Sequence, residues 1–184
     1  ESLLVSTGVV ALAEIGDKTQ LLAFILAARF KKPLPIVLGI LAATIVNHGL
    51  AGALGAWITS AISPEVLRWV LGASFLGMAI WTLIPDKIED EETQIAGRFG
   101  VFGATLITFF LAEMGDKTQI ATVAMAAHYA APVMVVIGTT LGMLIADVPA
   151  VFAGDTLANK IPMKLVHSLA AAITPVLPVA TLQG

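Results

Sequence analysis

The sequence predicts an all-α integral membrane protein with six transmembrane helices, arranged as two inverted-topology three-helix repeats. Of its 184 residues, 58% are apolar and only 12% are charged, whereas a soluble domain carries about 25% charge. Six apolar segments are each long enough to supply the roughly 20 helical residues that cross a bilayer. One heptapeptide occurs twice, beginning at Glu14 and again at Glu113, and it divides the chain into two similar halves.

The predicted spans are bounded by prolines and charged residues. Pro33 and Pro132 each suit the first turn of a helix, where the N–H that proline lacks would have no partner. Between the third and fourth spans lies an acidic segment, 86–98, which we expect to be a loop joining a first repeat, 1–85, to a second, 99–184. The predicted spans are 3–28, 34–61, 65–84, 99–127, 132–159 and 163–182.

Three spans per repeat is an odd number, so the second repeat should enter the membrane from the opposite side. Inverted repeats with a site near the bilayer midplane are typical of secondary transporters. Outside the spans, basic residues gather on one side, against Arg68 alone on the other. The positive-inside rule then makes loops 1–2, 3–4 and 5–6 cytoplasmic and both termini non-cytoplasmic, in a bacterial inner membrane. The basic side comprises Arg29, Lys31, Lys32, Lys87, Arg98, Lys160 and Lys164.

The two heptapeptides are identical at six of seven positions, with Ile15 in one replaced by Met114 in the other. Both fall near the bilayer centre, where ionisable residues are costly and mark functional sites. In a regular helix Glu14 and Asp17 would share a face and Thr19 would point away. Gly16 and Gly115 would permit either close helix packing or local unwinding. Buried ion pairs such as Glu14–Lys18 and Asp17–Lys117 could simply join helices, but that role does not require the motif twice, so we favour a functional site.

The four motif acids, Glu14, Asp17, Glu113 and Asp116, are the predicted metal ligands. Carboxylate, hydroxyl and amide oxygens suit Mn²⁺, Ca²⁺ or Mg²⁺, and the chain has no Cys for a thiolate site. Clustered buried carboxylates repel one another and favour protonation when no metal is bound. Competition between metal and protons for the same oxygens is the physical basis of antiport. No cofactor is expected, and the partners are the bilayer, divalent metal ions and protons.

Other polar residues are predicted to line the transport path or support the ligands. Within the motifs these are Lys18, Thr19, Gln20, Lys117, Thr118 and Gln119. The lysines either pair with the acids or tune their affinity for protons. Asn47 and Asp147 lie deep in their spans and could complete the coordination shell or a proton path. The alternatives are a helix-packing hydrogen bond for Asn47 and an interior salt link for Asp147.

The duplicated E-x-G-D-K-T signature resembles the GDT-type cation/proton exchangers, which include bacterial manganese exporters and the Golgi manganese/calcium transporter of animals. The resemblance covers essentially the whole chain. It implies proton-driven transport of Mn²⁺, Ca²⁺ or both, with Glu14, Asp17, Glu113 and Asp116 as ligands. The resemblance places the motif threonines and glutamines beside them.

We therefore predict a secondary active Mn²⁺ (and/or Ca²⁺)/H⁺ antiporter that exports metal from the cytoplasm, and no enzyme activity. One alternative is a passive divalent-cation channel. Another is a membrane-embedded metal-dependent hydrolase, although no Arg lies inside a span near the motif to bind phosphate. A helper subunit without transport is the third. The low charge without basic runs argues against a nucleic-acid partner. The sequence is compatible with a homo-oligomer as well as with a monomer.

Overall fold

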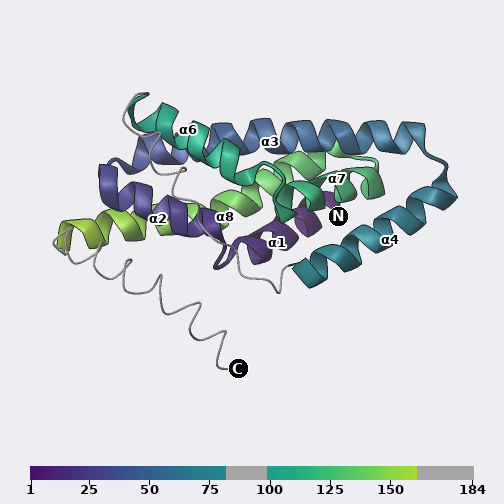
Figure 1. The fold of residues 1–184 in the computed structure, drawn as a ribbon, viewed down its shortest axis with the longest axis horizontal. Helices are drawn as coiled ribbons and strands as arrows, with labels where there is room; N and C mark the ends of the chain where they lie inside the picture. The colour runs from purple at the N-terminus through teal and green to yellow at the C-terminus, as the bar shows by residue number, and fades with distance from the viewer. Residues whose placement is uncertain (82–98, 161–184) are drawn as a thin grey trace, which may run out of the picture.

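A computed structural model describes residues 1–81 and 99–160 (Figure 1). The predicted loop 86–98 and the predicted span 163–182 lie outside these residues. Within the described ranges the chain is helical apart from short connections. Its helices are α1 (Ser2–Glu14), α2 (Lys18–Phe30), α3 (Pro33–Ala61), α4 (Pro64–Trp81), α6 (Gly100–Glu113), α7 (Lys117–Tyr129) and α8 (Pro132–Lys160).

The helices predicted for 34–61 and 132–159 are confirmed as α3 and α8. Each begins at its proline, as the missing N–H requires. The helix predicted for 65–84 begins as α4 at Pro64, and its last three predicted residues lie outside the described range. Proline position and apolar length were therefore sufficient to identify these elements.

The prediction of continuous helices over 3–28 and 99–127 is wrong, because both are broken inside the heptapeptide. α1 ends at Glu14 and α2 begins at Lys18, while α6 ends at Glu113 and α7 begins at Lys117. The glycine in each break has a positive φ, 79° at Gly16 and 77° at Gly115. This is a left-handed conformation that only glycine adopts without a steric cost. The unwinding that the glycines permit is therefore realised in both copies.

The two long helices run antiparallel to each other through the bundle (Figure 1). Gly52, in the second half of α3, lies against the start of α8: a Cβ added there would meet Val136 Cγ2 at 2.5 Å and Pro132 O at 3.6 Å. The absence of a side chain thus lets the two helices approach closely. α3 and α8 together form the scaffold against which the broken helices pack.

α3 packs closely against the two broken helices of the second half, α6 and α7, and a glycine of α3 lies at each contact. A Cβ at Gly39 would lie 2.7 Å from Thr105 Cβ of α6, and one at Gly55 would lie 2.5 Å from Val123 O of α7. Both distances are too short for a real side chain, so any larger residue would push α3 away from α6 or α7.

α8 holds the broken helices of the first half in the same way. A Cβ at Gly138 would lie 2.6 Å from Leu3 O of α1, and one at Gly154 would lie directly against Phe24 O of α2. Gly138 and Gly154 follow Gly39 and Gly55 by 99 residues, the same interval that separates the two heptapeptides. Each long helix therefore carries the broken pair of the opposite half.

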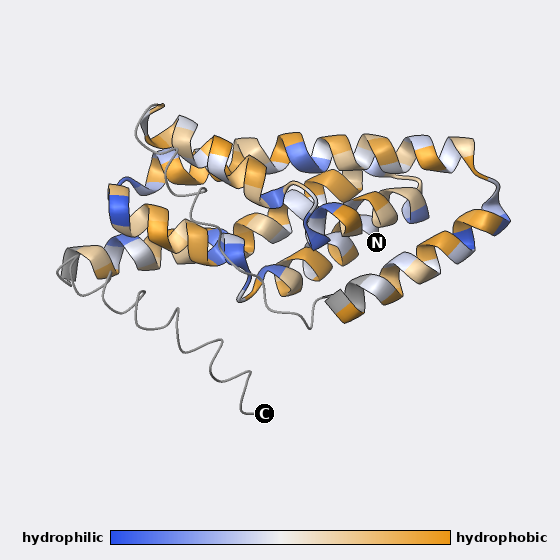
Figure 2. Cartoon of the chain, in the orientation of Figure 1, coloured by the Kyte–Doolittle hydropathy of each residue, from blue (hydrophilic) through white to orange (hydrophobic). Residues whose placement is uncertain are grey.

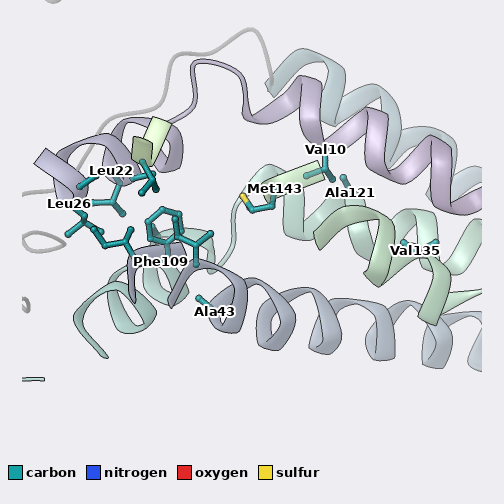
Figure 3. Packing of buried hydrophobic residues seen from close by; sticks show 14 of the residues in the cluster. Val10, Leu22, Leu26, Ala43, Phe109, Ala121, Val135 and Met143 are labelled. Atoms are coloured by element: carbon teal, nitrogen blue, oxygen red, sulfur yellow. The ribbon is translucent and has the colours of Figure 1, made fainter. Parts of the chain in front are cut away.

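Apolar side chains fill the bundle on both sides of the breaks (Figure 3). Leu22 and Leu26 of α2 lie together with Phe109 of α6 at one end, and all three are essentially inaccessible to solvent. Val10 of α1 and Ala121 of α7 lie at the other end, with Met143 of α8 between the two groups. The polar motif is thus enclosed by packed hydrocarbon along the bundle axis.

Hydrophobic residues predominate along the helices (Figure 2), and many of them are exposed on the outside of the bundle. Large side chains such as Leu4, Leu12 and Trp69 are each more than 70% exposed, which in a water-soluble protein would be unfavourable. α3, with 29 residues, and the 27 residues Pro132–Ala158 of α8 are long and apolar enough to cross a membrane. At about 1.5 Å per residue, α1 and α2 are each shorter than the roughly 30 Å hydrocarbon core of a bilayer.

Candidate metal site

The two helix breaks bring acids from both halves of the chain to one place. One carboxylate oxygen from each of Glu14, Asp17 and Asp116 lies within 4.8 Å of the other two. All three residues are buried, with Glu14 inaccessible and Asp17 and Asp116 only 4% and 3% exposed. Oxygen atoms at this spacing can converge on a single hard cation, whose ligand distances are about 2.0–2.6 Å.

Glu113, the fourth predicted ligand, is also inaccessible but lies outside this group of three. Its Oε2 accepts a hydrogen bond of 2.9 Å from Thr118 Oγ1 and lies 4.0 Å from His48 Nε2 of α3. The described structure therefore places three predicted ligands together and the fourth beside an imidazole. The position of His48 beside a motif acid was not predicted from the sequence.

The motif threonines point into the site, contrary to the expectation for a regular helix. Thr19 Oγ1 donates a hydrogen bond to Glu14 Oε2 and lies 3.4 Å from Asp17 Oδ2. Thr118 Oγ1 makes the equivalent contacts with Glu113 and, at 3.3 Å, with Asp116 Oδ2. The break changes the angular position of everything after the glycine, so each hydroxyl now links the two acids of its own motif.

The motif glutamines brace the breaks. Gln20 Oε1 accepts a hydrogen bond of 2.8 Å from Gly16 N, and Gln119 Oε1 accepts one of the same length from Gly115 N. Gln20 Nε2 also donates to Ala146 O of α8 at 3.0 Å. These bonds satisfy glycine N–H groups that have left the helix, so the glutamines fix the backbone that presents the acids.

The two lysines contact the aspartates of the opposite motif. Lys117 Nζ contacts Asp17 Oδ1 directly, and Lys18 Nζ lies 3.9 Å from Asp116 Oδ1. The predicted Asp17–Lys117 pair is thus present, while Lys18 reaches across to the second motif. The crossed pairs neutralise part of the negative charge and join the two breaks.

Polar residues of α3 and α8 complete the surroundings. Asn47 Nδ2 donates to Phe110 O at 3.1 Å, which is the packing hydrogen bond proposed as its alternative role. Asp147 is inaccessible, and neither of its oxygens has a hydrogen-bond partner among the described residues. Asp147 nevertheless interacts electrostatically with Glu14 and Asp17. Asp147 forms no ion pair with the described residues, so the salt link considered as its alternative role is not seen there.

Two buried hydroxyls of the long helices were not identified from the sequence. Thr44 of α3 and Thr140 of α8 are buried, and their Oγ1 atoms have no hydrogen-bond partner among the described residues. Threonine is common in apolar helices, where its hydroxyl usually bonds to its own backbone. The sequence signal that could have identified Thr44 and Thr140 is that each lies on the same helix as a deep polar residue, Asn47 or Asp147.

Two pockets lead toward the breaks. The larger, of about 510 Å³, lies between α2 and α8 and is lined by Gly16, Asp17 and Gln20 among others. The smaller, of about 240 Å³, lies between α3 and α7 and is lined by Gln119, Ile120 and Leu50 among others. The larger pocket reaches a motif acid, and the smaller reaches the bracing glutamine.

An apolar helical bundle with buried acids at two broken helices has the features of a membrane transport protein for a hard cation. Comparison with known proteins identifies the protein family. Residues 2–90 and 101–183 match the family described as divalent cation/proton antiporter GDT1. The chain belongs to this family, so it is a membrane cation/proton antiporter and not an enzyme.

Individual relatives agree with this assignment. A Vibrio cholerae protein described as a candidate manganese exporter is 51% identical over 180 residues, covering 97% of this chain and 89% of the relative. A GDT1-like protein 3 of Oryza sativa subsp. indica is 31% identical over 199 residues, covering 94% and 70%. A GDT1-like protein of Synechocystis sp. is 31% identical over 175 residues, covering 85% and 84%. No solved structure matches the chain.

Proposed function

We propose that this antiporter exports Mn²⁺ from the cytoplasm in exchange for protons, with Ca²⁺ as a second substrate. The observation that carries the proposal is the convergence of Glu14, Asp17 and Asp116 within 4.8 Å, from two separate breaks. Oxygen ligands suit both ions. The name of the Vibrio cholerae relative favours manganese and an outward direction.

In this proposal Glu14, Asp17 and Asp116 bind the metal directly, and Glu113 is the fourth acid of the site. Thr19 and Thr118 orient the carboxylates, while the glutamines hold the breaks in shape. Asp147 supplies a further carboxyl group that ionises when the metal binds, and Asn47 anchors α3 to α6. The motif-bearing helices move against α3 and α8 to expose the site alternately to each side.

Metal flux in proteoliposomes tests the ligand assignment. Glu14→Gln and Asp116→Asn each remove one charge from the group of three, and we expect Mn²⁺ and Ca²⁺ uptake to fall at least about 100-fold. Glu113→Gln changes an acid outside that group, and we expect a loss of roughly tenfold, as for residues that act through a ligand. Asp155→Asn is the control, because Asp155 is partly exposed and lies about 12 Å further along α8 than Asp147.

Uptake at the wild-type rate by Glu14→Gln or Asp116→Asn would contradict the ligand assignment. Equal losses for Glu14→Gln and Glu113→Gln would show instead that all four acids contribute alike. A wild-type protein that carries neither metal against its gradient when a pH gradient is imposed would contradict the proposed function itself.

We further propose that the two halves, 1–85 and 99–184, are inverted repeats of three spans each in a bacterial inner membrane. The antiparallel α3 and α8 support this arrangement, as do the glycine contacts that recur after 99 residues. The basic ends of α2 and α8 lie at the same end of the bundle (Figure 1), which supports a cytoplasmic location for that end.

Cysteine labelling tests the orientation, and the absence of native Cys makes single substitutions unambiguous. Lys31→Cys and Arg68→Cys both replace exposed residues. In intact cells a membrane-impermeant maleimide should label Cys at position 68 from the periplasm, and it should reach position 31 only after the membrane is opened. Labelling of both from the same side would mean that α3 does not cross the membrane, which would contradict the orientation proposed for the first half.

A further inference from the structure

The crossed lysine–aspartate pairs differ in how tightly they are made. Lys117 Nζ is in direct contact with Asp17 Oδ1, and its side chain is only 7% exposed. Lys18 Nζ lies 3.9 Å from Asp116 Oδ1, with a side chain that is 19% exposed. The first pair is therefore a desolvated ion pair, whereas the second is looser and closer to solvent.

The tight pair lies at the end of the larger pocket. Asp17 lines the pocket of about 510 Å³ between α2 and α8, together with Gly16 and Gln20. A cation that reaches the site by this route meets a carboxylate that already contacts an ammonium. It must therefore compete with the Lys117 ammonium for Asp17.

That competition depends on the charge of the arriving ion. A divalent cation at the position of the ammonium attracts the carboxylate with twice the Coulomb energy. A monovalent cation such as Na⁺ or K⁺ gains no Coulomb energy over the ammonium that it would displace. A divalent cation gains Coulomb energy at each of the three clustered carboxylates, which offsets its larger cost of losing water. The flexible four-carbon stem of lysine lets the ammonium move aside when a stronger competitor arrives.

We propose that Lys117 is a specificity-determining residue, whose ammonium at Asp17 excludes monovalent cations from the site and yields only to a divalent one. Lys18 performs the same task at Asp116 through its looser contact of 3.9 Å. This inference rests on the proposed transport function and names the basis of its selectivity for divalent ions.

The test measures how strongly monovalent salt inhibits metal uptake by proteoliposomes. The external salt is K⁺ or Na⁺ chloride in one arm and choline chloride in the other, at equal ionic strength, so that screening is constant. Uptake is measured with whichever of Mn²⁺ and Ca²⁺ the wild type carries. We expect the wild type to be equally active in both arms.

Lys117→Met keeps the apolar stem of lysine without its charge, and we expect K⁺ or Na⁺ to inhibit this variant roughly tenfold more than choline does. Lys117→Gln is the second variant, because its amide can still hydrogen-bond Asp17 and hold the helices together if Lys117→Met does not fold. Lys117→Arg keeps the charge and should behave like the wild type.

Lys18→Met is the matched comparison. It should show a smaller difference between the two salts than Lys117→Met, because the Lys18–Asp116 contact is looser than the Lys117–Asp17 contact. If folded Lys117→Met or Lys117→Gln shows the same ratio between the two salts as the wild type, the inference is wrong even though transport persists. A wild type that carries neither metal would instead contradict the proposed function.

Discussion

The two copies of the heptapeptide share a backbone but differ in what surrounds it. Gly16 and Gly115 have nearly the same φ, and each glutamate accepts a hydrogen bond from the threonine five residues later. Yet α3 presents His48 to the second glutamate, whereas 99 residues later α8 has Asp147. The two motif copies therefore have the same backbone shape. The residues that α3 and α8 place beside them differ in charge, with His48 on α3 and Asp147 on α8.

The two pockets are also lined mostly by equivalent positions of the two halves, but the larger one has additional lining residues. All six residues that line the smaller pocket follow or precede a residue of the larger one by 99 positions: Leu50, Ala51, Leu54, Gln119, Ile120 and Val123. The larger pocket has two further lining residues, Gly16 and Asp17. Similar walls thus enclose both routes, and the route between α2 and α8 is the one that extends to an acid.

The charge difference between His48 and Asp147 should be visible in metal affinity. Asp147→Asn removes a buried carboxyl group that interacts with Glu14 and Asp17, and a divalent cation nearby favours the ionised form of that group. We therefore expect Mn²⁺ affinity to fall about tenfold. His48→Gln removes no negative charge from the second half, so its affinity should stay within about twofold of the wild type. Titration calorimetry of the purified protein in detergent measures both. Equal losses would mean that the two halves contribute alike to the field at the ion.

Much of the fold could be predicted from the sequence, because the long helices are determined locally. α3 and α8 begin at prolines and are predominantly apolar over 29 residues each, so length and proline position were sufficient. The breaks could not be predicted with the same rules. Ile15 and Met114 continue the apolar pattern across them, and a single glycine is compatible with a helix. The break is stabilised by contacts that form only in the folded bundle, such as the Gln20 bond to Ala146 O.

The candidate site could be predicted as a set of residues but not as an arrangement. Repetition and depth identified the four acids. Which acids converge depends on how one half lies against the other, and the sequence does not contain that information directly. The same holds for the lysines, since Lys18 has an acid of its own motif nearby in sequence but lies beside Asp116 in the structure. Glu113 differs from Glu14 only through its neighbours on another helix.

Because the two copies share a backbone conformation, replacing the glycine in either copy should lower thermal stability by a small and similar amount. A Cβ at Gly16 or Gly115 would meet no atom within 4 Å, so alanine there causes no clash. The cost is conformational only, about 1–2 kcal/mol for an L-residue in the left-handed region. Gly16→Ala and Gly115→Ala should therefore lower the thermal midpoint in detergent by similar amounts, roughly 2–4 °C for each kcal/mol.

Gly8→Ala is the matched control, because Gly8 also has no atom within 4 Å of a built Cβ but lies inside α1 with helical geometry. Alanine favours the helix there by up to about 1 kcal/mol, so the midpoint should rise or stay constant. A fall for Gly8→Ala as large as that for Gly16→Ala would mean that the broken backbone is not what the glycines stabilise. If the thermal midpoints of Gly16→Ala and Gly115→Ala fell by different amounts, the two breaks would differ in backbone stability as well as in surrounding charge.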